Sequence, residues 1–118
     1  MSGDRMRRVN EAVREVLSSR LAEGLSDPRI GFVTVTSVDT SPDLRHARVY
    51  VSVLGDEEER RASMEALESS RGFLQARIGD ELRMKRTPAL SFHYDETVER
   101  ADRMTRLIDE VAPPEDGE

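Results

Sequence analysis

The sequence contains no cysteine, and none of its hydrophobic runs is long. Without cysteine, a disulfide framework, a thiolate nucleophile and a zinc–cysteine site are all excluded. No apolar stretch approaches the roughly 18 residues that a membrane span needs, and residues 1–11 lack the apolar segment of a signal peptide. We therefore expect a soluble, cytoplasmic protein with no membrane partner.

Signatures of catalysis are also missing. The two histidines, His46 and His93, fall in predicted strands and belong to no HExxH pattern. No GxSxG, Walker-type loop or recognisably spaced pair of carboxylates occurs, and the acidic stretch 55–59 lacks the spaced oxygen ligands of an EF-hand. We interpret that stretch as a helix cap, and we expect no catalytic residue, no metal and no cofactor.

The charge is unevenly distributed. The chain of 118 residues has a formal net charge of −6. Residues 95–118 contain nine acidic and three basic side chains, whereas residues 1–94 contain fifteen of each. Since binding to a polyanion depends on the local field, overall acidity does not exclude a basic face on the first 94 residues.

The first half of the chain predicts a helix followed by a hairpin. Apolar residues at helical spacing predict a helix over residues 4–23, with Asp4 as its N-cap and Gly24 as its stop. Alternation predicts strands over 32–38 and 45–54, joined by a short turn as an antiparallel pair. Ala47, Val49, Val51 and Val53 share one face, which only the helices can cover.

Residues 64–94 predict a helix, a break, a second helix and a strand. The break falls at residues 69–72, and the strand over 90–94 follows Pro88. Glycine inside a helix costs about 1 kcal/mol relative to alanine, so we expect Gly72 to serve close packing at a kink and a larger side chain there to overpack. A further acidic helix over 97–111 and a disordered tail over 112–118 complete the expected organisation.

Basic residues gather around this break and beyond it. Within residues 71–86, five cations are opposed only by Asp80 and Glu81. A helix N-terminus beside arginines suits phosphate, although an ordinary solvated helix face would carry similar charges. The predicted RNA-binding residues are Arg7, Arg8, Arg71, Arg77, Arg83, Lys85 and Arg86.

Helix–kink–helix–strand is the core of a KH-type module, but no GXXG loop is present, so sequence-specific reading of a single strand is not expected. Six short motifs, in their order and spacing, resemble the ribosome-binding factor A family of bacterial small-subunit assembly factors. They are Asp27–Gly31, Ser41–Leu44, Ala47–Val51, Gly72–Phe73, Arg83 and Pro88–Phe92.

The resemblance implies an α+β, KH-like (type II) domain with the order α-β-β-α-kink-α-β, a three-stranded sheet and its helices on one face. The family's Ala-x-Gly kink corresponds to Ser70, Arg71 and Gly72. We expect residues 1–95 to form the binding domain, 96–111 a C-terminal helical extension and 112–118 an acidic tail.

The function that the resemblance implies is that of a monomeric, non-enzymatic factor. It would bind free immature small (30S) subunits at 16S rRNA and assist late rRNA processing and maturation, including at low temperature. A ribosome-dependent GTPase would release it. Two alternatives stay open: a protein-interaction adaptor acting through the acidic C-terminal helix, and a small RNA-processing enzyme, for which no pair of catalytic groups is found.

Overall fold

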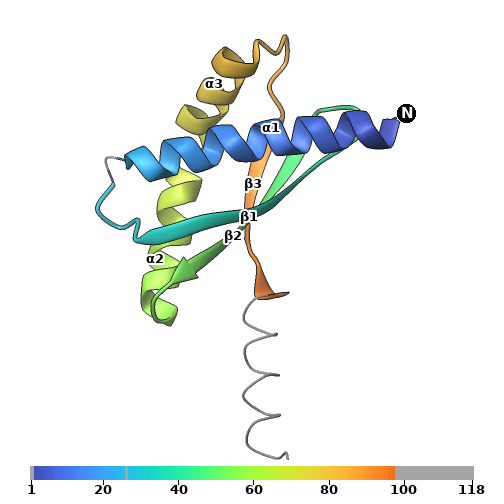
Figure 1. Cartoon of the computed structure of the whole chain (residues 1–118). Helices are drawn as coiled ribbons and strands as arrows, with labels where there is room; N and C mark the ends of the chain where they lie inside the picture. Colours follow the sequence, from blue (N-terminus) through green and yellow to red (C-terminus); the bar gives the residue numbers. More distant parts are fainter. Residues whose placement is uncertain (1, 26, 98–118) are drawn as a thin grey trace, which may run out of the picture.

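The computed structural model describes residues 2–25 and 27–97, which form three helices and one sheet (Figure 1). The predicted C-terminal helix, except for its first residue, and the predicted tail lie outside the described residues. The elements in chain order are α1 (Ser2–Glu23), β1 (Phe32–Thr40), β2 (His46–Leu54), α2 (Glu57–Ser69), α3 (Arg71–Leu82) and β3 (Ala89–Tyr94).

The sheet has the strand order β1-β2-β3. β1 and β2 pair antiparallel across a short turn, and β2 and β3 pair parallel because α2 and α3 carry the chain back between them. α1 crosses β1, and α2 and α3 lie beside β2 and β3 (Figure 1). This arrangement confirms the predicted element order, the three-stranded sheet and the antiparallel hairpin.

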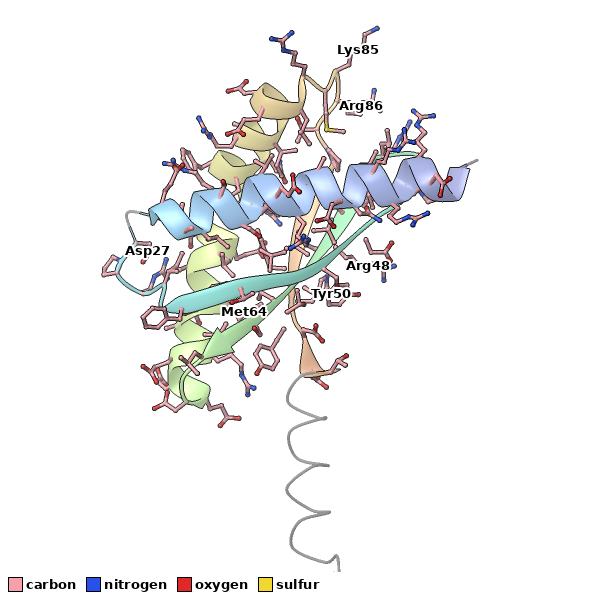
Figure 2. All side chains as sticks on the ribbon, in the orientation of Figure 1. Asp27, Arg48, Tyr50, Met64, Lys85 and Arg86 are labelled. Atoms are coloured by element: carbon pink, nitrogen blue, oxygen red, sulfur yellow. The ribbon has the colours of Figure 1, made fainter. Side chains whose placement is uncertain are left out.

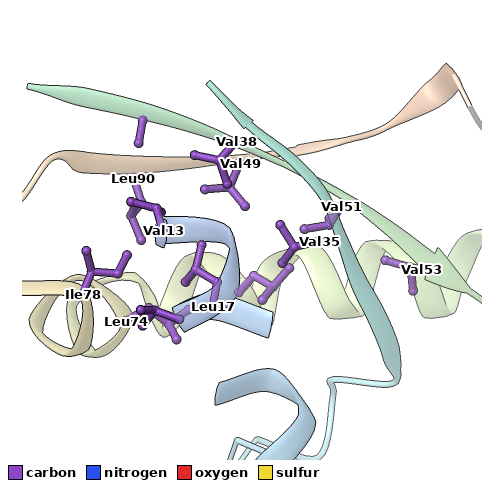
Figure 3. Packing of buried hydrophobic residues seen from close by; sticks show 13 residues of the cluster. Val13, Leu17, Val35, Val38, Val49, Val51, Val53, Leu74, Ile78 and Leu90 are labelled. Atoms are coloured by element: carbon purple, nitrogen blue, oxygen red, sulfur yellow. The ribbon is translucent and has the colours of Figure 1, made fainter. Parts of the chain in front are cut away.

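The core lies between the sheet and these helices (Figure 3). The predicted inward face of β2 is buried along its whole length, and Val13 and Leu17 of α1 pack against it. Burying one such side chain contributes about 1.5–3 kcal/mol, so these contacts dominate the stability of the fold. The largest fully buried apolar side chains are Leu17, Leu67, Leu74, Ile78, Val13, Val49 and Val51.

The ends of the first two elements differ from their predicted bounds. α1 begins at Ser2, so Asp4 lies in its first turn and pairs with Arg7; the prediction that Asp4 is the N-cap is wrong. The carboxylate still favours the helix, since it lies near the positive end of the helix dipole. β1 continues to Thr40, whose backbone N–H donates to the Asn10 side chain at 2.9 Å.

The acidic stretch before α2 is a helix cap, as predicted. The Asp56 side chain accepts a hydrogen bond from the Glu59 backbone N–H, and the Glu59 carboxylate accepts one from the Asp56 N–H. This reciprocal pair satisfies two amides that the first turn of a helix leaves without partners. It fixes where α2 begins, immediately after β2.

The kink between α2 and α3 falls at Ser70, inside the predicted segment. Ser70 (φ −91°, ψ 3°) is both the C-cap of α2 and the N-cap of α3. Its N–H donates to the Ala66 carbonyl of α2 at 3.0 Å, and its carbonyl accepts from the Leu74 N–H of α3 at 3.0 Å. The expected packing role of Gly72 is wrong, because a Cβ at Gly72 would meet nothing within 4 Å. In α3 the glycine at a close contact is Gly79, whose Cβ would lie 2.5 Å from Thr87 Oγ1.

These two glycines give a matched pair of substitutions. Gly72→Ala is expected to raise the stability of the protein by up to about 1 kcal/mol, because alanine is the better helix former and the site is open. Gly79→Ala is expected to lose that advantage, since Thr87 would have to rotate away. Thermal unfolding followed by circular dichroism measures both, and a lower midpoint for Gly72→Ala would restore a packing role for that glycine.

Candidate nucleic-acid interface

A basic corner, defined as residues 83–86, connects α3 to β3. Arg83 ends α3 in the left-handed conformation (φ 52°, ψ 46°), and the Met84 N–H donates to the Gly79 carbonyl at 3.2 Å. Met84 packs against the core, and Pro88 is fully buried. These two apolar side chains hold the corner against the core, and its three basic side chains are exposed to solvent.

Arg83, Lys85 and Arg86 are exposed, and none of them forms an ion pair with a residue that the structure describes. Lys85 and Arg86 project away from the molecule beyond the end of α3 (Figure 2). A cluster of uncompensated cations retains its full field, and guanidinium groups can bind phosphate oxygens in a bidentate manner. The corner is therefore suited to a polyanion.

Further cations lie at the same end of the sheet. The Ala89 N–H donates to the Arg45 carbonyl at 2.8 Å, which places the start of β3 beside the start of β2. The first turns of α1 lie against the β1–β2 turn, where Arg5 and Pro42 line one hollow. Arg5 and Arg8 form no ion pair with a described residue. Arg45 forms a long ion pair with Asp43, at 4.0 Å.

The sequence prediction missed Arg5 and Arg45. Helical spacing does not indicate the position of Arg45, because Arg45 precedes a strand and lies beside the start of β3 only through the parallel pairing of β2 with β3. Of the two predicted arginines on α1, Arg8 belongs to the unpaired group, whereas Arg7 is paired with Asp4.

The structure places Arg71 and Arg77 apart from the corner. Arg71, which is exposed, pairs with Glu68 at 2.6 Å, and the half-buried Arg77 pairs with Glu81 at 2.7 Å. At 1.5 Å per residue, α3 separates Arg71 from Arg83 by roughly 18 Å. The predicted set thus divides into an unpaired group at one end of the sheet and two compensated arginines along α3.

The Asp27–Gly31 motif has a structural role in the loop between α1 and β1. The Asp27 carboxylate accepts from the Arg29 backbone N–H at 3.0 Å and from its guanidinium at 2.6 Å. The buried Ser63 hydroxyl of α2 accepts from the Gly31 N–H at 3.1 Å and donates to the Arg29 carbonyl at 3.3 Å. Arg29 also donates to Ser69, so the loop is tied to α2 near the kink.

The Asp27 pair predicts an acid-dependent part of the stability. Hydrogen bonds from the Arg29 side chain, and then from its backbone, lower the pKa of Asp27 from 3.8 to about 2. A carboxyl whose pKa is lowered by folding stabilises the fold above its unfolded pKa and loses that effect as the pH falls through its folded pKa. The stability difference between the protein and Asp27→Asn is therefore expected to shrink between about pH 4 and about pH 2.

Thermal unfolding across that range measures the effect. A difference that stays constant from pH 5 to pH 2 would show that the negative charge of Asp27 has no part in the loop's stability.

The open face of the sheet carries both histidines. The rings of Tyr50 and His93 lie 5.4 Å apart, and Ser91 Oγ is 2.9 Å from His93 Nε2. Arg48 pairs with Asp39 at 3.3 Å beside them.

The described residues, 2–25 and 27–97, contain no group of three acidic or histidine side chains placed to hold a metal ion. None of the three helices has the length and apolar character that a membrane span requires.

Comparison with known proteins decides the family. The family model described as ribosome-binding factor A matches residues 5–108. The chain belongs to the ribosome-binding factor A family. It is 43% identical over 110 residues to the ribosome-binding factor A of Geobacter metallireducens, covering 93% of each chain. It is 51% identical over 109 residues to that of Anaeromyxobacter dehalogenans, covering 92% of this chain and 79% of the relative.

Solved structures of the family share the fold. The crystal structure of ribosome-binding factor A from Thermus thermophilus superposes with a TM-score of 0.66 at 27% identity, over 75% of this chain and 94% of that one. A homology model of Thermus thermophilus ribosome-binding factor A, fitted into a cryo-electron-microscopy map of a 30S complex, gives 0.61 at 29% identity, over 72% of this chain and 89% of that one. A Thermotoga maritima solution structure of a putative ribosome-binding factor A gives 0.59 at 34% identity, over 77% and 83%.

Proposed function

We propose that this protein binds the free small (30S) ribosomal subunit and that the basic corner contacts 16S rRNA. Three cations without ion-pair partners among the described residues, on a corner held by Met84 and Pro88, carry the proposal. Family membership supports it, as does the 30S complex of the Thermus thermophilus relative. Arg5, Arg8 and Arg45 extend the contact around the same end of the sheet.

Contacts of this kind recognise the phosphate backbone. Phosphate contacts fix the position and orientation of a protein on nucleic acid but carry no base sequence. The chain has no GXXG loop to hold a single strand, so selectivity would come from the folded shape of the rRNA. Arg71 and Arg77 can join this contact if phosphate displaces Glu68 and Glu81, because exposed ion pairs contribute only about 0–1 kcal/mol.

The finer role that we propose is the one the family resemblance implies. Residues 1–95 act as a cytoplasmic, monomeric binding domain that assists late 16S rRNA processing and subunit maturation, including at low temperature. The extension 96–111 and the tail 112–118 lie beyond it. A ribosome-dependent GTPase releases the protein, and neither a catalytic residue nor a cofactor takes part.

Sedimentation tests the proposal directly. In a lysate gradient the protein is expected to travel with free small subunits and to be absent from joined ribosomes. Purified small subunits and purified 16S rRNA are then titrated separately over a salt series. Binding to both, weakening steeply with salt, supports an rRNA contact. Absence from the small-subunit fraction overturns the proposal, and binding to particles but never to rRNA favours the adaptor alternative.

A further inference from the structure

We propose that the end of the sheet opposite the basic corner is a docking surface for a basic, apolar-bearing protein segment of the small-subunit particle. The surface, called the acidic end below, consists of Phe32, Leu54, Tyr94 and the first turn of α2, Glu57–Arg60 with its cap Asp56. The proposal rests on the proposed function, since it places the second contact on the same particle.

Two large apolar side chains are exposed side by side at this end. Phe32 is 78% exposed and Leu54 is 75% exposed, and the two are direct partners across β1 and β2. Single exposed apolar residues are ordinary, but an adjacent pair of this size forms a contiguous patch that water solvates poorly. The patch continues over a hollow lined by Val53, Gly55 and Tyr94.

The hollow is framed by carboxylates. Residues 55–65 contain five acidic side chains and two arginines. The guanidinium of Arg60 lies over the Tyr94 ring at 4.4 Å and pairs with Glu57 at 3.5 Å, and Arg61 pairs with Glu58. Both arginines are therefore held by the protein's own groups, and the surplus charge around the apolar patch is negative.

This charge selects the occupant. RNA is a polyanion and would be repelled. A second copy of the chain in a symmetric contact would bring the same carboxylates together. Residues 98–118 of this chain carry a surplus of four negative charges and would be repelled as well. A protein segment that places arginine or lysine beside an apolar anchor satisfies both the patch and its rim.

The two ends are placed to act at the same time. β2 runs from the corner to the acidic end, and the eight steps of roughly 3.3 Å between its nine residues separate the two ends by roughly 26 Å. Lys85 and Arg86 project from the end at which β2 begins (Figure 2), and the acidic end lies where β2 finishes at Leu54. Opposite charges at the two ends would orient the protein on a particle whose surface presents both RNA and basic protein.

Replacing acidic residues of the acidic end by lysine shows whether protein or RNA binds there. The affinity falls if the partner is a basic protein segment and rises if it is RNA. Glu57→Lys together with Glu58→Lys is expected to weaken binding to purified small subunits about tenfold while leaving binding to purified 16S rRNA no weaker. If the rim faced RNA, the same change would tighten binding to both. Glu15→Lys with Glu23→Lys on α1 makes the same change in net charge elsewhere and is the matched control.

A photo-reactive residue at position 54 identifies what lies against the patch. In complexes with purified small subunits it is expected to cross-link to a protein segment rich in arginine and lysine, while the same probe at position 85 cross-links to rRNA. Cross-linking of position 54 to rRNA, to a second copy, to residues 98–118 or to nothing overturns the inference.

The position-85 probe keeps the two proposals apart. If it reaches no rRNA and the protein does not co-sediment, the proposed function itself fails and the docking surface falls with it. Phe32→Ser with Leu54→Ser is expected to weaken small-subunit binding about tenfold without affecting rRNA binding, whereas Phe73→Ser, another exposed apolar position, changes neither.

Discussion

Replacing Arg83, Lys85 and Arg86 by glutamine is expected to weaken binding to free small subunits and to flatten its salt dependence. Each phosphate neutralised contributes roughly 0.7–0.9 to the slope of log affinity against log salt, so three lost contacts reduce that slope by about 2–3. The fold should survive, because Met84 and Pro88, which anchor the corner, are unchanged.

The matched control removes three arginines that are already compensated. Arg14, Arg20 and Arg48 pair with Glu11, Glu23 and Asp39, respectively, and changing them to glutamine alters the net charge by the same amount. Co-sedimentation over a salt series, with circular dichroism to check folding, compares the two triple variants. Equal slopes would show that the basic corner is only a solvated surface.

The sequence was sufficient for the order of the elements and for most of the core. Alternation from Ala47 to Val53 and the helical stripe of α1 each leave one apolar face, and the two faces cover each other in the structure. Periodicity is a weaker guide to where a strand ends and to where its pairing is irregular. The irregular pairing between Val35 and Ser37 and the extra residues of β1 depend on partners that lie far away in the chain.

The candidate site was predicted only in part. A run of cations from Arg71 to Arg86 looks like one patch in a linear sequence, but α3 spreads it along a helix. The ion pairs of Arg71 and Arg77 could have been predicted from the sequence, because Glu68 and Glu81 lie three and four residues away on a helix. The contribution of Arg45 required the parallel register of β2 and β3, which no local pattern specifies.

The glycines of α3 also show that sequence periodicity does not reveal tertiary contacts. A glycine near a helix break suggested close packing at residue 72, but the break is made by the backbone of Ser70, and Gly72 faces open space. The close contact is at Gly79, where α3 passes Thr87 of the following connection. Since that neighbour comes from a segment without regular structure, periodicity could not reveal it.

Phe73 and Leu74 are adjacent apolar residues of α3, and the structure separates their roles. Leu74 is fully buried in the core, whereas Phe73 is 46% exposed beneath the Arg20 guanidinium, which lies 5.0 Å from its ring centre. In an ideal helix adjacent residues point about 100° apart, so both cannot face the sheet. The packing buries only the leucine.

Leu74→Ala is therefore expected to destabilise the protein by about 2–5 kcal/mol, from lost burial and the cavity left behind. Phe73→Ala, which removes the larger side chain, is expected to cost under about 1.5 kcal/mol, since the ring is half exposed and loses mainly its contact with Arg20. For a domain of this size each kcal/mol moves the unfolding midpoint by roughly 4–8 °C, so the two variants separate clearly in a thermal scan. A larger loss for Phe73→Ala than for Leu74→Ala would mean that α3 is rotated about its axis. Because the basic corner directly follows α3, such a rotation would also move Arg83, Lys85 and Arg86 away from their common end of the sheet.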